Sequence, residues 1–494
     1  AASDVYKRQD PQIADSNSEK LVAANCYEGL VRIMADGTIG KGVATDWNIS
    51  DDGLTYTFKL RNNSHWAMFS GHKAVLGENY EDTFDITVKA EDFKFGIERT
   101  LSEQTGSADA PLFSAVKSIS TPDDFTIVFN LSYADDNFLY ALTNPGAMPC
   151  DEEFFNLTNG KYGLDAKYLL CNGPFHVSKW TEKTSVKLVK NNEYNGESSV
   201  SPSSVTFYIN NNDSEVADKM NSVTYDVAFL SSSQFSSIEN KKDLNSVAVQ
   251  NVTYSFIFNQ NDNNYRNKNM RLAFCRSCDT SSLFDSQSDI SKADGIVPPS
   301  CKIGGEDYRN GNAAELLSYD ETLAKKNFND ALLELGSSSV ETTILCTEQY
   351  ESFVKQMVQK LQKTLGVKFV STVKVVSESD LEAAVNDGNY SVAFYPFKAK
   401  SSFAGEIIEG FDQNNIFGYE SDVLSQKIRN IKNNSGSLEG ERSAVADAEN
   451  YLVSEAVIMP VFYENSYFVT SKKTSGIYFY SSADNVCFIN AKKS

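Results

Sequence analysis

Alternating apolar and polar residues predict β-strands in the first third of the chain. Every second residue from Leu54 to Leu60 is apolar, and this run follows the turn sequence Asp51-Asp52-Gly53, which predicts a hairpin with one buried face. The pattern recurs from Phe125 to Leu131. Between the two runs, apolar residues from Phe93 to Leu101 recur every four positions, as on an amphipathic helix. We therefore expect one α+β domain over residues 45–168.

A different order of elements is predicted after residue 340. The runs are strand Val340–Cys346, helix Phe353–Leu365 stopped by Gly366, strand Val367–Val376, helix Leu381–Val385 closed by Gly388, and strand Tyr390–Tyr395. This βαβαβ order predicts parallel strands with right-handed crossovers. Ligands bind beyond the carboxyl ends of such strands, which here are Cys346-Thr347-Glu348 and Tyr395-Pro396-Phe397.

Length, charge and hydropathy narrow the class of protein. A chain of 494 residues is too long for one ordinary core and should divide into two or three lobes. Its 45 Lys and Arg against 66 Asp and Glu give a net charge of −21, which repels nucleic acid. No run approaches the roughly 18 apolar residues of a membrane-spanning helix. Polar tracts at 231–240 and 430–441 predict surface loops.

The common signatures of enzymes are missing from the sequence. A phosphate-binding GxxxxGK[ST] loop, a GxGxxG fingerprint, a GxSxG nucleophile elbow and an HExxH zinc motif are all absent. The chain has only three histidines, so a catalytic triad or a histidine-rich metal site would have few residues to use. His65 and His72 could share a metal, but surface or packing roles are favoured. We predict a protein that is not an enzyme and holds neither a metal nor a cofactor.

The eight cysteines leave the redox compartment open. Cys275, Cys278 and Cys301 allow a structural disulfide such as Cys278–Cys301, buried free thiols, zinc binding or redox chemistry, and the disulfide is favoured. The partners of Cys346 and Cys487 are not predicted. Cys26, on an apolar segment expected to be helical, is interpreted as a buried free thiol.

A series of short motifs resembles one family of proteins. In chain order these are Asp10-Pro11-Gln12, Tyr27-Glu28-Gly29-Leu30-Val31-Arg32, Asp36-Gly37, Ala44-x-x-Trp47, Asp52-Gly53-Leu54-Thr55-Tyr56-Thr57-Phe58, Ala90-Glu91-Asp92-Phe93 with Arg99, Asn172-Gly173-Pro174-Phe175, Trp180, Lys190-Asn191 with Tyr194, Phe258-Asn259, and Asn269-Met270-Arg271-Leu272-Ala273. The series resembles the oligopeptide- and dipeptide-binding subunits of ABC importers, family 5 of the extracytoplasmic solute-binding proteins. Order and spacing carry the resemblance, because each motif alone occurs widely.

The resemblance implies an α/β, two-lobed fold of the periplasmic-binding-protein type II, with an additional inserted α+β domain. Lobe I would comprise residues 10–44, 169–265 and 469–494, domain II residues 45–168, and lobe III, with the parallel sheet, residues 266–468. Two chain crossings near Arg266 and Phe468 would form the hinge. The ligand would lie between the lobes, and closure around it would create the surface that a permease recognises.

The same resemblance implies a set of ligand-binding residues. They are Asp15, Asn17, Tyr254, Ser255, Phe256, Tyr395 and Phe397. In such a site the backbone of an extended peptide pairs with protein backbone, and wet pockets tolerate varied side chains. For each aromatic residue the alternative reading is packing in the core.

One position departs from the family pattern. Peptide binders of this family place an aspartate after the third strand, where it pairs with the α-ammonium group of the peptide, whereas this chain has Pro396. A buried ammonium without a carboxylate loses several kcal/mol, so another acid, with Asp15 as the candidate, must serve. Otherwise the ligand is a different solute, such as a nickel chelate, haem or an oligosaccharide. A surface adhesin or chaperone derived from the fold and a secreted hydrolase are the alternatives from other classes.

Cys150 and Cys171 flank the proposed return of the chain from the inserted domain. We predict that they form a disulfide, with a stabilisation of roughly 3 kcal/mol from loop closure. An oxidising, extracytoplasmic location would follow, either as a lipoprotein or as a periplasmic or secreted protein whose signal segment is absent from this chain. Residues 1–9 lack the apolar run of a signal peptide. The expected partners are a peptide and a membrane permease, and the expected state is a monomer.

Overall fold

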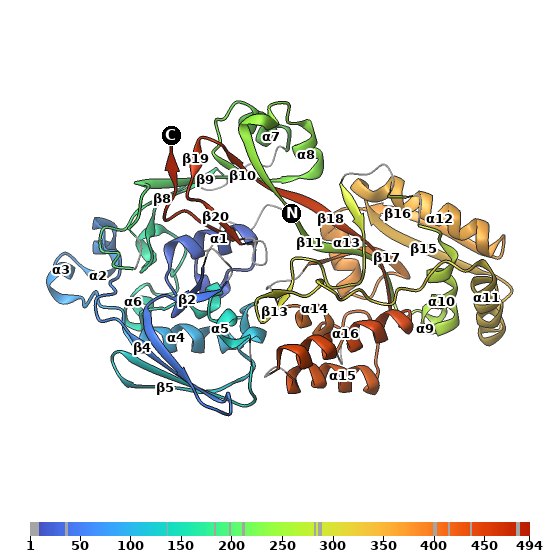
Figure 1. Cartoon of the computed structure of the whole chain (residues 1–494), viewed down its shortest axis with the longest axis horizontal. Helices are drawn as coiled ribbons and strands as arrows, with labels where there is room; N and C mark the ends of the chain where they lie inside the picture. The colour runs from blue at the N-terminus through green and yellow to red at the C-terminus, as the bar shows by residue number, and fades with distance from the viewer. Residues whose placement is uncertain are drawn as a thin grey trace. The chain divides into compact units, whose positions relative to one another are not determined.

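The computed structural model describes residues 9–34, 38–135, 137–181, 184–196, 199–209, 213–280, 283–284, 289–398, 403–412, 415–434, 437–480 and 485–494. These residues form two compact units. The small unit contains residues 231–233 and 248–467, and the large unit contains the segments up to 230, 234–247 and 468–494. Each unit is built around sheets with helices packed against them (Figure 1).

A mixed β-sheet organises the small unit. Its strands are β11 (Leu244–Phe258), β12 (Ile290–Lys292), β15 (Val340–Thr347), β16 (Phe369–Val376), β17 (Val392–Lys398) and β18 (Ile458–Ser471). Their order is β18-β11-β17-β15-β16, with β12 beside β18, and the ends of β11 and β18 continue into the large unit. β15 runs parallel to β16 and β17, whereas β11 is antiparallel to β17.

Helices cover both faces of this sheet. One face packs against α9 (Asn263–Arg266), α10 (Lys268–Ser277), α11 (Glu321–Leu335) and α12 (Glu351–Leu365). The other packs against α13 (Glu378–Asn386), α14 (Gly405–Glu409), α15 (Asp422–Asn433) and α16 (Leu438–Ser454), together with the segment that holds β13 (Lys302–Ile303) and β14 (Glu306–Asp307). Figure 1 shows α15 and α16 side by side. We call these the α12 face and the α16 face.

The predicted βαβαβ segment is confirmed. Strands β15, β16 and β17 alternate with helices α12 and α13, and the pairing of β15 with both other strands is parallel. Gly366 ends α12 at a positive φ of 79°, where its N–H caps the carbonyl of Gln362. The strand after it begins at Phe369, two residues later than the predicted Val367.

The large unit contains the predicted hairpins. β3 (Ala44–Ile49) and β4 (Thr55–Leu60) are antiparallel, as are β5 (Val116–Asp123) and β6 (Thr126–Leu131), and the four form one sheet in the order β3-β4-β6-β5. The predicted helix is α4 (Ala90–Leu101). Phe58 and Phe129, which the alternation placed on the buried face, are fully buried. The α+β character predicted for this segment is therefore confirmed.

The remaining elements of the large unit are short. The helices are η1 (Pro11–Ile13), α1 (Asn17–Cys26), η2 (Ser70–His72), α2 (Lys73–Leu76), α3 (Tyr80–Thr83), η3 (Ala110–Phe113), α5 (Phe138–Ala141), η4 (Pro145–Ala147), α6 (Glu152–Leu157), η5 (Ala166–Tyr168), α7 (Asp213–Asn221) and η6 (Lys241–Asp243). The strands are β1 (Val31–Ile33), β2 (Ile39–Lys41), β7 (Phe175–Thr181), β8 (Ser185–Lys190), β9 (Ser204–Tyr208), β10 (Val227–Ser231), β19 (Thr474–Ser475), β20 (Tyr478–Tyr480), β21 (Asn485–Cys487) and β22 (Lys492–Lys493). β7, β8 and β9 form a second sheet.

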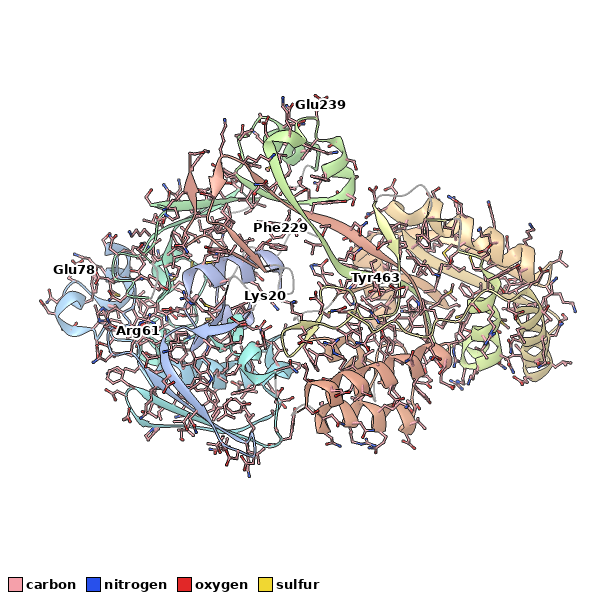
Figure 2. The ribbon with its side chains drawn as sticks, in the orientation of Figure 1. Lys20, Arg61, Glu78, Phe229, Glu239 and Tyr463 are labelled. Carbon is pink, nitrogen blue, oxygen red and sulfur yellow. The ribbon has the colours of Figure 1, made fainter. Side chains whose placement is uncertain are left out.

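Buried ion pairs hold motifs of the large unit in place. Arg61, labelled in Figure 2, pairs with Glu28 of the Tyr27–Arg32 motif, and both side chains are largely buried. The Arg99 guanidinium meets Asp10 at 2.6 Å and donates to Gln12 Oε1 at 2.6 Å. Breaking either pair would leave an uncompensated buried charge, so both pairs hold N-terminal motifs against distant segments of the chain.

The predicted lobe boundaries, including the one near Arg266, stay predictions; the small unit comprises residues 231–233 and 248–467, and the second half of β11 pairs with β17 there. One sequence prediction about chain organisation differs from the structure. The polar tract 231–240 contains helix α8 (Ser232–Ser237), and the tract 430–441 holds the end of α15 and the start of α16. The further division of the large unit into lobe I and domain II stays a prediction.

Candidate functional site

The carboxyl ends of the parallel strands in the small unit collect aromatic and polar side chains. Strand β15 ends at Thr347, and the short helix η7 (Glu348–Tyr350) turns the chain into α12. The ring of Tyr350 lies over the sheet there, with its centroid 4.4 Å from that of Tyr254 on β11. This edge is where open α/β sheets bind ligands, because loops and helix starts converge there.

Strand alternation explains why these rings meet. Tyr254, Phe394 and Phe462 stand on adjacent strands and point to the α12 face. The Tyr254 centroid lies 5.5 Å from that of Phe394 and 5.1 Å from that of Phe462. Tyr254 and Tyr350 form the outer end of this aromatic cluster, and Tyr254 is only partly buried.

A carboxylate completes the cluster. The hydroxyl of Tyr350 donates to Glu464 Oε1 at 2.5 Å, and the Gln349 amide donates to the Tyr350 hydroxyl at 3.0 Å. Burial, and then the charge of Glu464, raises the pKa of Tyr254. Burial, the neighbouring Tyr254 and the charge of Glu464 raise the pKa of Tyr350 as well. Both phenols therefore stay protonated at neutral pH, and each hydroxyl is able to donate a hydrogen bond.

The predicted ligand residues of the small unit do not share one surface. In the register of β11 with β17, Ser255 lies opposite Tyr395 and Thr253 opposite Phe397. Tyr395 and Phe397 pack on the α16 face, whereas Tyr254 and Phe256 point to the α12 face. The alternating direction of side chains along a strand causes this separation.

Two of these predicted residues belong to the packed core. Phe256 is fully buried and contacts Phe274 and Phe394, with centroid distances of 5.3 and 4.9 Å. Phe397 is 8% exposed and stacks on Phe411 at 5.7 Å. The alternative reading of core packing therefore describes both rings. Tyr254 and Tyr395 keep partial exposure, and Ser255 is buried with a hydroxyl that has no partner among the described residues.

Asp15 and Asn17, the predicted residues of the large unit, lie at the start of α1. Asp15 is exposed, and its backbone N–H donates to Glu19 Oε2 at 3.2 Å. Glu19 and Ser16 form the capping box of the helix. Asn17 is the first residue of α1, and its side chain lies outside the described residues.

Tyr350, Gln349 and Glu464 were missed by sequence reasoning. Tyr350 could have been found, because it lies two residues after the predicted strand end Cys346-Thr347-Glu348. Glu464 also left a signal: it is a charged residue at the end of the apolar run from Val457 to Tyr463. Neither signal says that the two side chains meet, because 114 positions separate them.

The disulfide predicted between Cys150 and Cys171 is absent from the structure, where all eight cysteines are free. Cys150 lies beside Arg99, with 3.5 Å from Nη1 to Sγ. Cys171 instead lies near Cys26, whose pKa is raised by burial and then by the neighbouring Cys171 thiol. The backbones of Cys150 and Cys171 are hydrogen-bonded to different segments. The Cys150 N–H donates to the carbonyl of Asp92, and the Cys171 carbonyl accepts from the N–H of Ala67.

The fold also bears on the alternatives offered for Cys275, Cys278 and Cys301, which included a disulfide and a zinc site. Cys275 and Cys278 belong to the core on the α12 face, whereas Cys301 is buried on the α16 face. The sheet therefore separates Cys301 from the other two, which contradicts both the Cys278–Cys301 disulfide and a zinc site made of all three. No group of three or more His, Cys, Asp or Glu within the described ranges could hold a metal ion.

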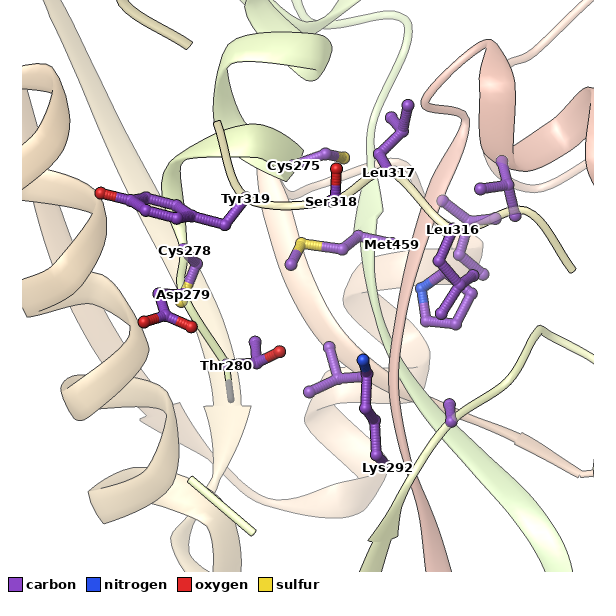
Figure 3. A pocket seen from close by; sticks show the side chains of 15 residues that line it. Cys275, Cys278, Asp279, Thr280, Lys292, Leu316, Leu317, Ser318, Tyr319 and Met459 are labelled. Carbon is purple, nitrogen blue, oxygen red and sulfur yellow. The ribbon is translucent and has the colours of Figure 1, made fainter. Parts of the chain in front are cut away.

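Cys275 and Cys278 line a cavity of about 210 Å³ in the small unit. Figure 3 shows Met459, Cys275 and Cys278 among the side chains that line this cavity. The Cys278 thiol contacts the carbonyl of Met357 at 3.8 Å. Burial raises the pKa of both cysteines to about 12, so they are thiols and not metal-binding thiolates at neutral pH.

Burial of the cysteines predicts slow thiol chemistry in the native protein. Burial also raises the pKa of Cys150 to about 12 and that of Cys346 to about 11. Since only the thiolate reacts with Ellman's reagent, we expect a slow reaction at pH 8 for the native protein and eight reactive thiols after unfolding without reductant. Two thiols fewer in the unfolded, unreduced protein would demonstrate a disulfide.

Comparison with known families gives a match over most of the chain. The profile of the family described as "Bacterial extracellular solute-binding proteins, family 5 Middle" matches residues 38–417. The dipeptide-binding protein DppE of Bacillus subtilis is 23% identical over 491 residues, which cover 95% of this chain and 87% of that protein.

Solved structures show the same fold. The peptide-bound structure of Listeria monocytogenes OppA superposes with a TM-score of 0.78 at 21% identity, covering 100% of this chain and 98% of that one. A dipeptide-binding protein from Pseudoalteromonas sp. SM9913, in complex with Met-Leu, gives a TM-score of 0.78 at 17% identity, covering 99% of this chain and 98% of that one. The predicted α/β binding-protein fold is confirmed.

Proposed function

Because the chain belongs to family 5 of the bacterial extracellular solute-binding proteins, we propose that it binds oligopeptides outside the cytoplasm and delivers them to the permease of an ABC importer. DppE and the L. monocytogenes OppA, which bind a dipeptide and a peptide, support this proposal. The proposed role requires no bond to be broken. The protein would act as a monomer, and its net charge of −21 argues against nucleic acid as a partner.

The observation that carries the proposal is the group of Tyr254, Tyr350, Gln349 and Glu464 at the carboxyl edge of β15. Ring faces beside a few convergent polar groups are typical of ligand sites. Tyr254 is partly buried and Glu464 is half-buried. A peptide offers the complementary chemistry: amides, a terminal ammonium and apolar side chains.

An extracytoplasmic location is part of the proposal. The family is described as extracellular. No helix in the described part of the chain has both the length and the apolar composition to cross a membrane. Anchoring as a lipoprotein would keep the protein close to its permease.

A thermal-shift screen tests the proposed function. Mixed peptides of three to six residues are added in excess over the protein. A ligand at 100 times its dissociation constant stabilises the native state by about 2.7 kcal/mol, so we expect a clear rise in melting temperature. Isothermal titration with the active pool then gives the affinity. No shift with any peptide would contradict peptide binding.

A non-peptide solute is the second candidate, and Pro396 is the observation that favours it. Pro396 stands where peptide binders of the family are expected to carry an aspartate, and it lies directly opposite Tyr254 in the sheet. A solute without a free amine would need no such acid. Nickel chelates, haem and oligosaccharides belong in the same screen, and a shift with one of them alone would favour this candidate.

A further inference from the structure

Glu464 offers an incompletely paired carboxylate at the candidate site. Its Oε1 accepts from the Tyr350 hydroxyl at 2.5 Å, and the Gln349 amide lies 3.4 Å from the same oxygen. Among the described residues, no donor reaches Oε2, and no lysine or arginine pairs with Glu464. The side chain is half-buried, so a ligand can reach it.

The direction of the strand sets where this carboxylate points. Tyr463, labelled in Figure 2, points to the α16 face, where its hydroxyl accepts from the N–H of Asp294 at 3.0 Å. The next residue therefore points to the opposite face. Glu464 accordingly stands on the α12 face, the face of Phe462 and Tyr254, whose ring centroids are 5.1 Å apart.

We propose that Glu464 binds the terminal ammonium group of the peptide, with the rings of Tyr254 and Tyr350 beside it. This inference rests on the proposed function. Glu464 would supply the negative charge that the chain lacks at Pro396, from a strand two places away in the order β18-β11-β17. It would be the residue that selects ligands with a free amine.

The surroundings suit an ammonium ion. A carboxylate forms strong, charge-assisted hydrogen bonds with ammonium groups, and the face of an aromatic ring attracts a cation. The Tyr350 hydroxyl occupies Oε1 and orients the carboxylate, which leaves Oε2 for the ligand. Gln349 donates to Tyr350 at 3.0 Å and holds that hydroxyl in place.

Asp15, the acid suggested by sequence, is the competing candidate. It is an exposed residue before α1, without a neighbouring ring or ion pair among the described contacts. An ion pair between the ligand and a fully exposed carboxylate contributes little to affinity, because water screens the two charges. An ion pair at a half-buried carboxylate contributes more. The geometry therefore favours Glu464.

Matched peptides and variants test the inference. The probe is a lysine-free random pool of tri- to hexapeptides, used with free amino termini and after N-acetylation. We expect the wild type to prefer the free amines. Glu464→Gln should weaken binding of the free-amine pool by about 30-fold or more and leave binding of the acetylated pool unchanged, because only the ion pair is lost.

Three further variants serve as controls. Glu341→Gln removes an exposed carboxylate at the amino end of β15 and should change neither affinity. Glu464→Asp keeps the charge and should retain the preference for free amines. Asp15→Asn should retain it as well. Thermal unfolding of each variant without ligand shows whether the fold is preserved.

The outcomes separate the two levels of the proposal. If Glu464→Gln still prefers free amines, or if Asp15→Asn loses the preference, the role of Glu464 is wrong while peptide binding stands. If the wild type binds the free-amine pool and the acetylated pool equally well, the role of Glu464 is also wrong, and peptide binding again stands. If the wild type binds neither pool, the proposed function itself fails, and the role of Glu464 fails with it.

Discussion

Replacing Glu449 with alanine is expected to lower the free energy of unfolding of the small unit by about 3–5 kcal/mol. Glu449 on α16 is 1% exposed and makes an ion pair with Arg309. It also accepts from the N–H groups of Ile296 and Val297 at 2.7 and 3.0 Å and from the hydroxyl of Tyr308 at 3.0 Å. The substitution would leave a buried guanidinium and three donors without their acceptor.

Calorimetric unfolding of the variant and the wild type checks this expectation. Glu439→Ala is the matched control, because Glu439 is an exposed glutamate at the start of the same helix and should contribute no more than about 1 kcal/mol. Peptide affinity at a temperature where the variant is folded should change little. An unchanged melting temperature for Glu449→Ala would show that the network does not hold the loop of residues 294–312.

Phe256→Ala is expected to cost about 3–5 kcal/mol of stability. The family resemblance suggested that Phe256 contacts the ligand, but its ring is fully buried against Phe274 and Phe394. Removing the ring leaves a cavity that rigid neighbours cannot fill. The variant should therefore lose stability and not specificity.

Chemical denaturation and peptide titration together distinguish core packing from ligand contact. Leu333→Ala, which truncates an apolar side chain that is 80% exposed in the same unit, is the control and should lie within about 0.5 kcal/mol of the wild type. Loss of affinity by Phe256→Ala at unchanged stability would restore this residue to the binding site.

Much of the fold could be predicted because its signals are local. The alternation over Leu54–Leu60 and the helical period over Phe353–Leu365 follow from the fixed directions of side chains along a strand and a helix. Gly366 marked a helix end because a positive φ is easy only for glycine. The polar tract 231–240 was misread, since tertiary contacts can outweigh the weak helix propensity of serine.

The candidate site could be predicted only in part. Its location at the carboxyl end of β15 followed from the βαβαβ order, and Tyr254 lies there. The residues that the resemblance implied come from both faces of the sheet. Strand β17 is buried on both faces, so its sequence has no alternation of apolar and polar residues that would tell one face from the other. Ser255, Tyr395 and Phe397 therefore lie across the sheet from Tyr254.

By itself, the sequence determined the strands around residues 54–60 and 125–131, the parallel βαβαβ unit and the family, because each depends on patterns along a continuous stretch of chain. The tertiary structure alone decided that Cys171 meets Cys26 and not Cys150, and that the Tyr350 hydroxyl meets Glu464. Such contacts join residues more than a hundred positions apart. They depend on how packed elements bring distant backbones together, which no local pattern records.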